Sequence, residues 1–144
     1  MTNAQSILQK KGSDVATVDR KTTVLDAART MNQRRIGAVV VADGDRVVGI
    51  FTERDILNRV VAAGKDPKTT RVEEVMTSPM ACCRRDTSLT DCKTVMSQKR
   101  IRHLPVVEEG KLYGMISAGD ILAGEVSDQQ ATIEYLHEYL YGRR

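Results

Sequence analysis

Hydrophobic residues along this chain follow two kinds of spacing, and each is typical of one kind of secondary structure. A continuous apolar run at residues 37–42 predicts a strand that is buried on both faces. Val24, Ala27 and Met31 lie three and four residues apart, which is the spacing of an amphipathic helix. Polar turns such as Asp43-Gly44-Asp45 separate neighbouring apolar runs. The pattern therefore predicts a mixed fold of class α/β (α+β).

The same pattern occurs twice along the chain. Residues 17–60 align without a gap with residues 82–125, at an offset of 65 residues, and most pairs are identical or exchange one apolar residue for another. Each copy reads β-α-β-β-α, and a unit of about 60 residues is near the size at which a lone core is marginal. We therefore expect two tandem repeats, over residues 1–65 and 66–127, that pack together about a pseudo-twofold axis.

Local signals give the bounds of each element. A helix in the first copy is predicted to begin at Thr22 or Thr23, and another to begin at Thr52 and end at Gly64. Thr70 and Glu73 form the pattern of a capping box that opens a short helix. The other expected elements are helices at 4–9, 72–76, 88–98 and 118–126 and strands at 17–18, 46–51, 81–83, 103–107 and 111–116.

Residues 128–144 have no counterpart in the first copy and are predicted to form a C-terminal helix and tail. Ile133, Leu136 and Leu140 recur at helical spacing, which gives this helix a wider apolar face than a lone surface helix needs. Two interpretations remain open: the helix packs back on its own protomer, or it contacts a second copy of the chain.

Composition limits the classes of function. The chain is 41% hydrophobic and 28% charged, as in ordinary globular proteins, and its net charge is only +3, so nucleic-acid binding is not expected. Because no apolar run approaches the roughly 18 residues of a membrane span and no signal peptide is recognisable, we expect a cytoplasmic protein. Cys82, Cys83 and Cys92 are therefore expected to be free thiols, without the spacing of a metal site. No nucleophile, base and acid set is visible, so an enzyme is not expected.

A Thr/Ser-x-x-Asp pattern stands at one helix start in each copy, as Thr52 to Asp55 and as Ser117 to Asp120. Free N–H groups at a helix start favour a phosphate, and a carboxylate can accept hydrogen bonds from both hydroxyls of a ribose. The same pattern is also an ordinary helix cap, so a ligand site and a purely local cap both remain open.

The doubled β-α-β-β-α order, with Gly-Ile-Phe-Thr-Glu-Arg-Asp in one copy and Gly-Met-Ile-Ser-Ala-Gly-Asp in the other, resembles the CBS domain pair, or Bateman module. The resemblance implies a stand-alone regulatory protein that binds an adenosine ligand in the clefts between its repeats. AMP is expected foremost, then ATP, ADP or NAD(H), and S-adenosylmethionine last. It also implies a homodimer that signals to an unknown effector protein. The alternative is a dimeric structural module with empty or degenerate clefts.

The resemblance further assigns residues to two clefts. Around the base, the Asp120 cleft is expected to use Thr22, Ala27, Ile36 and Ala38, and the Asp55 cleft Thr87, Cys92, Ile101 and Pro105. Thr52 and Ser117 would contribute the hydroxyls at the helix starts. Arg54 would contact phosphates in one cleft; since Gly119 replaces it in the second copy, His103 or Arg102 would supply the cation there. The alternatives are a solvated Arg54 and a histidine without a ligand.

Overall fold

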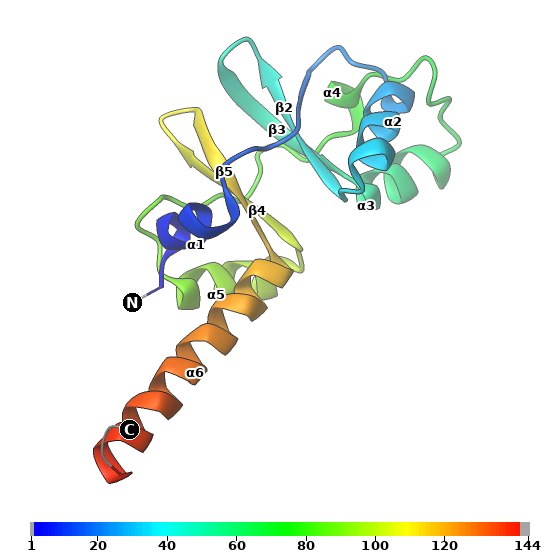
Figure 1. Ribbon diagram of the computed structural model, residues 1–144. Helices are drawn as coiled ribbons and strands as arrows, with labels where there is room; N and C mark the ends of the chain where they lie inside the picture. Colours follow the sequence, from blue (N-terminus) through cyan, green and yellow to red (C-terminus); the bar gives the residue numbers. More distant parts are fainter. Residues whose placement is uncertain (1, 142–144) are drawn as a thin grey trace.

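A computed structural model describes residues 2–141 of the chain and shows two lobes side by side (Figure 1). The first lobe has a three-stranded sheet in which β1 (Thr17–Asp19) runs parallel to β2 (Ala38–Asp43) and β2 runs antiparallel to β3 (Arg46–Thr52). The second has an antiparallel pair, β4 (His103–Glu108) and β5 (Lys111–Ser117). The expected mixed α/β class with tandem repeats is thus confirmed.

Helices cover these sheets from outside. The first lobe contains α2 (Val24–Arg34), a short α3 (Glu53–Asp55) that continues as a π-helical segment, η1 (Ile56–Val61), and α4 (Val72–Val75). The second contains α1 (Ala4–Lys11), α5 (Leu89–Lys99) and α6 (Ala118–Tyr141). Thr23, and not Thr22, caps α2, because its side chain accepts a hydrogen bond from the backbone N–H of Asp26.

The short helix that precedes each repeat packs on the other lobe. α1 contributes Ala4, Ile7 and Leu8 to the core of the second lobe, although it comes first in the chain. α4 contributes Val72 and Val75 to the core of the first lobe. The chain therefore crosses between the lobes twice, and the end of α1 comes to lie beside the start of α6.

Two glycines at matching positions allow these crossings. A Cβ atom added to Gly114 would lie 2.5 Å from Leu8 Cδ2, and one added to Gly49 would lie 2.6 Å from Met76 Sδ and 2.9 Å from the Thr77 carbonyl oxygen. All three distances are shorter than real Cβ contacts, so a side chain at either position would push the crossing segment away. The repeat of Gly49 as Gly114 thus has a steric reason.

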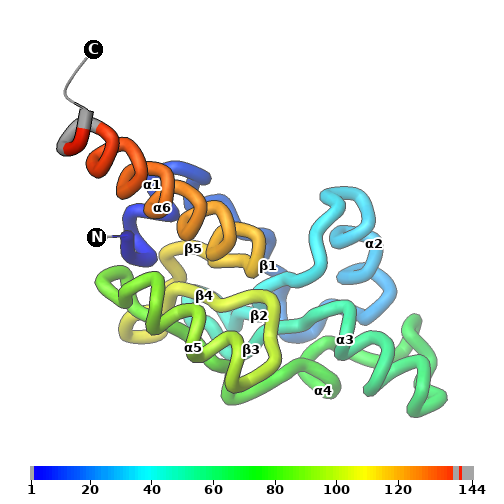
Figure 2. The backbone as a smooth tube through the Cα atoms, turned by 90° about the horizontal axis from the view of Figure 1, so that it is seen from below, coloured from blue at the N-terminus to red at the C-terminus, as the bar shows by residue number. Residues whose placement is uncertain are grey.

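The sheets meet through apolar side chains between β3 and β5. Ile50 and Met115, which are equivalent under the repeat, pack with Ala38 and Val40 in a small core that belongs to both lobes. The Val47 N–H also donates to the Gly110 carbonyl oxygen at 3.1 Å. These contacts, with Figure 2 showing both sheets between the outer helices, confirm that the repeats pack as one unit.

Two local expectations were wrong. The predicted strand at 81–83 is reduced to a single bridge between Cys83 and Val106, since Pro105 stands at the position of Val40 and lacks the N–H that Val40 donates to Ala16. The predicted capping box of α4 is also shifted by one residue. The carboxylate of Glu74, not Glu73, accepts from the Arg71 N–H at 2.7 Å, and Thr70 is buried.

The last helix also differs from its prediction. Residues 118–126 and 128–141 were expected as separate helices, but α6 is continuous and extends away from both lobes (Figure 1). Ile133, Leu136 and Leu140 are exposed, so these three apolar side chains are not buried on their own protomer. The predicted tail at 142–144 lies outside the described residues. Among residues 2–141, no helix is long and apolar enough to span a membrane.

Candidate functional site

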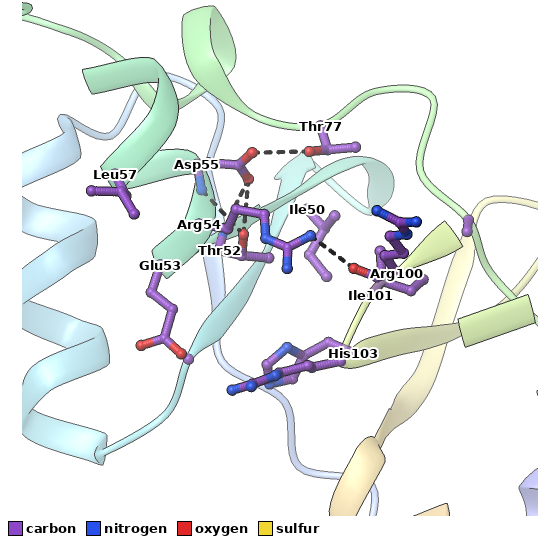
Figure 3. A pocket seen from close by; sticks show the side chains of 13 residues that line it. Ile50, Thr52, Glu53, Arg54, Asp55, Leu57, Thr77, Arg100, Ile101 and His103 are labelled. Carbon is purple, nitrogen blue, oxygen red and sulfur yellow. Dashed lines mark hydrogen bonds between the residues drawn. The ribbon is translucent and has the colours of Figure 1, made fainter. Parts of the chain in front are cut away.

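A pocket of about 450 Å³ lies where the two lobes meet, within the usual size range of small-molecule sites (Figure 3). The first lobe supplies the start of α3, and the second supplies the segment between α5 and β4. We call it the Asp55 pocket. It is lined by Gly37, Ile50, Thr52, Glu53, Arg54, Asp55, Leu57, Thr77, Ala81, Arg100, Ile101, Arg102 and His103.

Asp55 is held at the start of α3 by three hydrogen bonds. Its Oδ2 accepts from the backbone N–H of Thr52 at 3.0 Å and from the Thr52 hydroxyl at 3.3 Å, while Oδ1 accepts from the Thr77 hydroxyl at 3.1 Å. The Thr52 hydroxyl oxygen lies 3.3 Å from the Asp55 N–H, which completes a capping box. The local cap predicted from Thr-x-x-Asp is therefore present. A carboxylate has about four acceptor positions, so about one remains for a ligand.

Arg54 connects the two sides of the pocket. Its Nη1 donates to the carbonyl oxygen of Arg100 at 2.8 Å, across the boundary between the lobes (Figure 3). Arg100 caps the end of α5 in the left-handed conformation, with φ of 54°. This conformation directs the chain from α5 into β4, and it brings Ile101 and His103 into the pocket. A guanidinium group has five N–H donors, so Arg54 keeps donors for an anion.

Basic and apolar groups share the remaining surface. Arg102 is exposed at the rim, and His103 is half-buried beside it. Burial lowers the pKa of His103, and the nearby Lys11 and Arg102 lower it further, although Glu53 and Asp120 oppose them. The imidazole is therefore neutral near pH 7 and can both donate and accept a hydrogen bond.

The second copy places the same carboxylate in a different setting. Ser117 N–H donates to Asp120 Oδ2 at 2.8 Å, and the Asp120 N–H donates to the Ser117 hydroxyl at 3.1 Å, as in the first copy. Lys11 Nζ, however, lies 2.7 Å from the same Oδ2. Burial alone would raise the pKa of Asp120, but the Lys11 ammonium and Ser117 lower it overall.

The structure brings some of the predicted residues together and places others elsewhere. Thr52, Arg54, Asp55 and Ile101 line the Asp55 pocket as expected. Arg102 and His103 were assigned to the Asp120 cleft, but both line the Asp55 pocket, because β4 begins at the boundary between the lobes. Whether any of them contacts a ligand stays a prediction.

Several predicted base contacts lie in structural positions. Thr87 accepts from the Arg84 N–H at 2.9 Å, and the Thr22 carbonyl oxygen accepts from Val72, so both anchor loops. Cys92 and Pro105 are fully buried in the second lobe and are not part of the Asp55 pocket lining. Ala27 is buried in the core of the first lobe. Ile36 and Ala38 stand at the positions of Ile101 and His103; Ile36 is exposed, whereas Ala38 is buried between the sheets.

Three polar contacts in the two clefts were missed at the sequence level. Thr77 follows α4, and no local pattern links it to an acid 22 residues earlier. Arg100 contributes a backbone carbonyl, which a sequence does not display. Lys11 meets an acid 109 residues away. Arg35 and Arg100 are the same residue at equivalent positions of the two repeats, and this was the one sequence signal that pointed to Arg100.

The thiols were expected to be free, and they are. Cys82 is exposed and Cys83 buried, as expected for neighbours on an extended segment. Contact with Cys92 and burial raise the pKa of Cys83, so this thiol is protonated at pH 7. No group of three or more His, Cys, Asp and Glu side chains within residues 2–141 could hold a metal ion.

Comparisons with known proteins agree with this architecture. The family model of the CBS domain matches residues 7–62 and again residues 72–126. YhcV of Bacillus subtilis (strain 168), a CBS domain-containing protein, is 34% identical over 126 residues, which are 88% of this chain and 89% of YhcV. The mitochondrial CBSX3 of Arabidopsis thaliana is 34% identical over 125 residues, but these are 83% of this chain and only 61% of that relative.

Two solved structures have the same fold. A protein with CBS domains from Burkholderia ambifaria MC40-6 superposes with a TM-score of 0.84 at 40% identity, covering 89% of this chain and 96% of that one. The hexameric CBS-CP12 protein from bloom-forming cyanobacteria superposes with a TM-score of 0.73 at 34% identity, covering 85% of this chain and 70% of that one. Because the family model covers both halves and similar chains share the doubled fold, this protein belongs to the CBS domain family, whose members are generally regulatory modules, and it carries two CBS domains in tandem.

Proposed function

We propose that this protein is a non-catalytic sensor that binds an adenine nucleotide in the Asp55 pocket. One observation carries the proposal. At the boundary between the lobes, a pocket of about 450 Å³ combines apolar walls, one buried carboxylate at a helix start and several basic side chains. This combination suits a flat base, a sugar with neighbouring hydroxyls and a phosphate. AMP is the first candidate, followed by ATP, ADP and NAD(H).

Each part of the nucleotide has a complementary surface. Ile50 and Ile101 offer an apolar slot for the base, formed by both lobes. Asp55 has about one free acceptor position for a ribose hydroxyl. Arg54 and Arg102 suit the phosphate, because a guanidinium matches phosphate oxygens in a bidentate manner. In this proposal these residues bind and orient the nucleotide, and none of them acts as an acid, a base or a nucleophile.

Signalling would follow from the position of the pocket between the lobes. A nucleotide that contacts Asp55 on one side and Arg102 on the other would favour one arrangement of the two lobes. An effector protein that prefers this arrangement would then bind with a coupling free energy of about 1–3 kcal/mol. The alternative function is a structural module whose clefts are degenerate. For the second cleft, the ion pair between Lys11 and Asp120 favours this alternative.

A thermal-shift experiment tests the proposed ligand. AMP, ADP, ATP, NADH and S-adenosylmethionine at millimolar concentration are compared with GMP and adenosine. AMP should raise the melting temperature, because a ligand of the native state stabilises it. Arg102→Ala should reduce the shift with AMP but not with adenosine, which lacks the phosphate. Arg34→Ala, at an exposed position outside the pocket lining, is the matched control. No shift with any of the five ligands would contradict the proposal.

We also propose that two copies of the chain form a homodimer. Leu57 and Leu122 are equivalent under the repeat and are 60% and 62% exposed; Val61 and Val126 form a second such pair. A pseudo-twofold pair of apolar patches can meet a second copy symmetrically. Placing Lys at both Leu57 and Leu122 should give monomers in light scattering, whereas Lys at both Leu136 and Leu140 tests the end of α6 separately. A wild-type monomer at tens of micromolar would exclude the dimer.

A further inference from the structure

The Asp120 cleft contains a cation that the chain itself supplies. Lys11 Nζ donates to Asp120 Oδ2 at 2.7 Å and to the carbonyl oxygen of Met115 at 2.9 Å. Asp120 and Met115 stand 65 residues after Asp55 and Ile50. The two acceptors of Lys11 are therefore the counterparts of two acceptors in the Asp55 pocket.

In the Asp55 pocket a neutral residue satisfies the same two acceptors. The Thr77 N–H donates to the Ile50 carbonyl oxygen at 2.8 Å, and the Thr77 hydroxyl donates to Asp55 Oδ1 at 3.1 Å. One ammonium group thus replaces an N–H and a hydroxyl. The replacement changes the charge in direct contact with the acid: the Lys11 ammonium pairs with Asp120 at 2.7 Å, whereas Thr77 is neutral and the cation beside Asp55, Arg59, lies 3.8 Å from its Oδ1.

Asp120 also faces a different space. With Lys11 it lines a pocket of about 520 Å³ between α1 and α6, inside the second lobe and not at the boundary between the lobes. This pocket exists because Gly124 stands where the first copy has Arg59, which fills the corresponding position and donates to the Met76 carbonyl oxygen at 2.7 Å. The carboxylate of the second copy is thus turned toward α1.

We propose that Lys11 is an intramolecular occupant of the Asp120 cleft, so that the chain binds its nucleotide in the Asp55 pocket alone. The inference rests on the proposed function and specifies its stoichiometry. A ribose hydroxyl is a neutral donor, and charge-assisted hydrogen bonds are roughly twice as strong as neutral ones. The ribose therefore does not displace the Lys11 ammonium from Asp120.

Titration calorimetry of the full chain with AMP tests this inference. Wild type should bind one AMP per chain. Lys11→Met keeps most of the aliphatic stem but removes the ammonium group, and it should bind two. Adding Asp120→Ala to this variant should return the stoichiometry to one. Lys65→Met is the matched control, because it makes the same charge change at an exposed position outside this pocket, and Lys65 forms no ion pair within the described residues; it should bind one. Circular dichroism checks that each variant is folded.

The outcomes separate this inference from the proposed function. Two AMP per wild-type chain, or one AMP for both wild type and Lys11→Met, would overturn the role of Lys11 and leave the nucleotide sensor intact. No binding by any folded variant would overturn both. Binding by Lys11→Met but not by wild type would keep the role of Lys11 and refute the Asp55 pocket as the nucleotide site.

Discussion

Asp55 and Asp120 occupy the same position in the two halves of the molecule, yet their surroundings differ. The Asp55 side chain is 7% exposed and is held only by neutral donors at hydrogen-bonding distance. The Asp120 side chain is 21% exposed and pairs with Lys11. An identical residue at an identical place in a fold therefore does not guarantee an identical site. The elements that pack against the acid decide which cation lies beside it and how close that cation is.

The helices that follow the two acids differ as well. After Asp55 the chain forms the π-helical segment η1, and Arg59 lies 3.8 Å from Asp55 Oδ1 while it bonds to the end of α4. After Asp120, α6 continues as a regular helix, and Gly124 leaves space. The cation near the acid thus comes from the following helix in one half and from the preceding lobe-crossing helix in the other.

The largest expected effect separates the two acids directly. Asp55→Ala should weaken AMP binding by about 1.5–3 kcal/mol, the cost of a lost charge-assisted hydrogen bond. Asp120→Ala should leave the affinity of wild type unchanged, because Lys11 already occupies that carboxylate. Titration calorimetry with AMP measures both.

Stability should distinguish the same pair of variants. Because Asp55 is buried, its removal leaves the Thr77 hydroxyl and the Thr52 N–H without an acceptor, at a cost of about 1–3 kcal/mol in the free energy of unfolding. Urea unfolding should show a smaller loss for Asp120→Ala, and equal losses would mean that the two acids are equivalent after all.

The two crossing glycines give the next largest effect. Gly49→Ala and Gly114→Ala should each destabilise the fold by about 1–3 kcal/mol through overpacking. Gly114→Ala also strains the backbone, since Gly114 has φ of 159°, whereas the costly contact of Gly49→Ala is a backbone oxygen of Thr77, which cannot rotate away as Leu8 can. Gly49→Ala should also weaken AMP binding, since Thr77 holds Asp55. Gly119→Ala, with ordinary contact distances in α6, is the control and should be neutral or stabilising.

A third difference concerns acid stability. Arg85 and Glu108 form a close pair at 2.8 Å, and the bonds from Arg85 lower the pKa of Glu108 to about 2. In the equivalent pair, Arg20 and Asp43 lie 3.5 Å apart, and the Asp43 carboxylate is more exposed than that of Glu108. Because the folded pKa of Glu108 lies below its ordinary value of 4.5, its stabilisation is complete above that pH and disappears as the pH falls toward 2.

Melting curves at several pH values test this third difference. The gap in melting temperature between wild type and Glu108→Gln should be largest near neutral pH and should close between pH 4.5 and 2. Asp43→Asn should show a smaller gap. A gap for Glu108→Gln that does not change with pH would mean that the carboxylate charge contributes nothing.

The smallest expected effect concerns a feature in which the halves agree. Arg35 and Arg100 both end a helix with φ of 54°, a conformation that favours glycine. Arg35→Gly and Arg100→Gly should each stabilise the fold by about 0.5 kcal/mol, as relief of strain exceeds the entropy cost of glycine. Only Arg100→Gly should also affect AMP binding, because only Arg100 lines the Asp55 pocket. Destabilisation in urea unfolding would show that the side chains matter more than the strain.

Much of the fold could be predicted from local patterns. The strands and the caps at Thr52 and Ser88 follow from spacing within a few residues along the chain, and the repeat follows from comparing segments 65 residues apart. The reduction of the strand at 81–83 was also predictable in principle, because Pro105 removes one ladder hydrogen bond. The start of α4 and the junction inside α6 were less accessible, since neighbouring residues there support two alternatives.

The sequence by itself determined that one β-α-β-β-α unit is used twice and that an acid stands at the start of one helix in each copy. Hydrophobic spacing and capping act between near neighbours, so they can be read from the chain. Only the tertiary structure decided that Thr77 meets Asp55 and that Lys11 meets Asp120. Those contacts depend on helices α1 and α4 crossing to the opposite lobes, and they join residues up to 109 positions apart. The charge of each cleft is therefore a property of packing between distant segments, which no local pattern encodes.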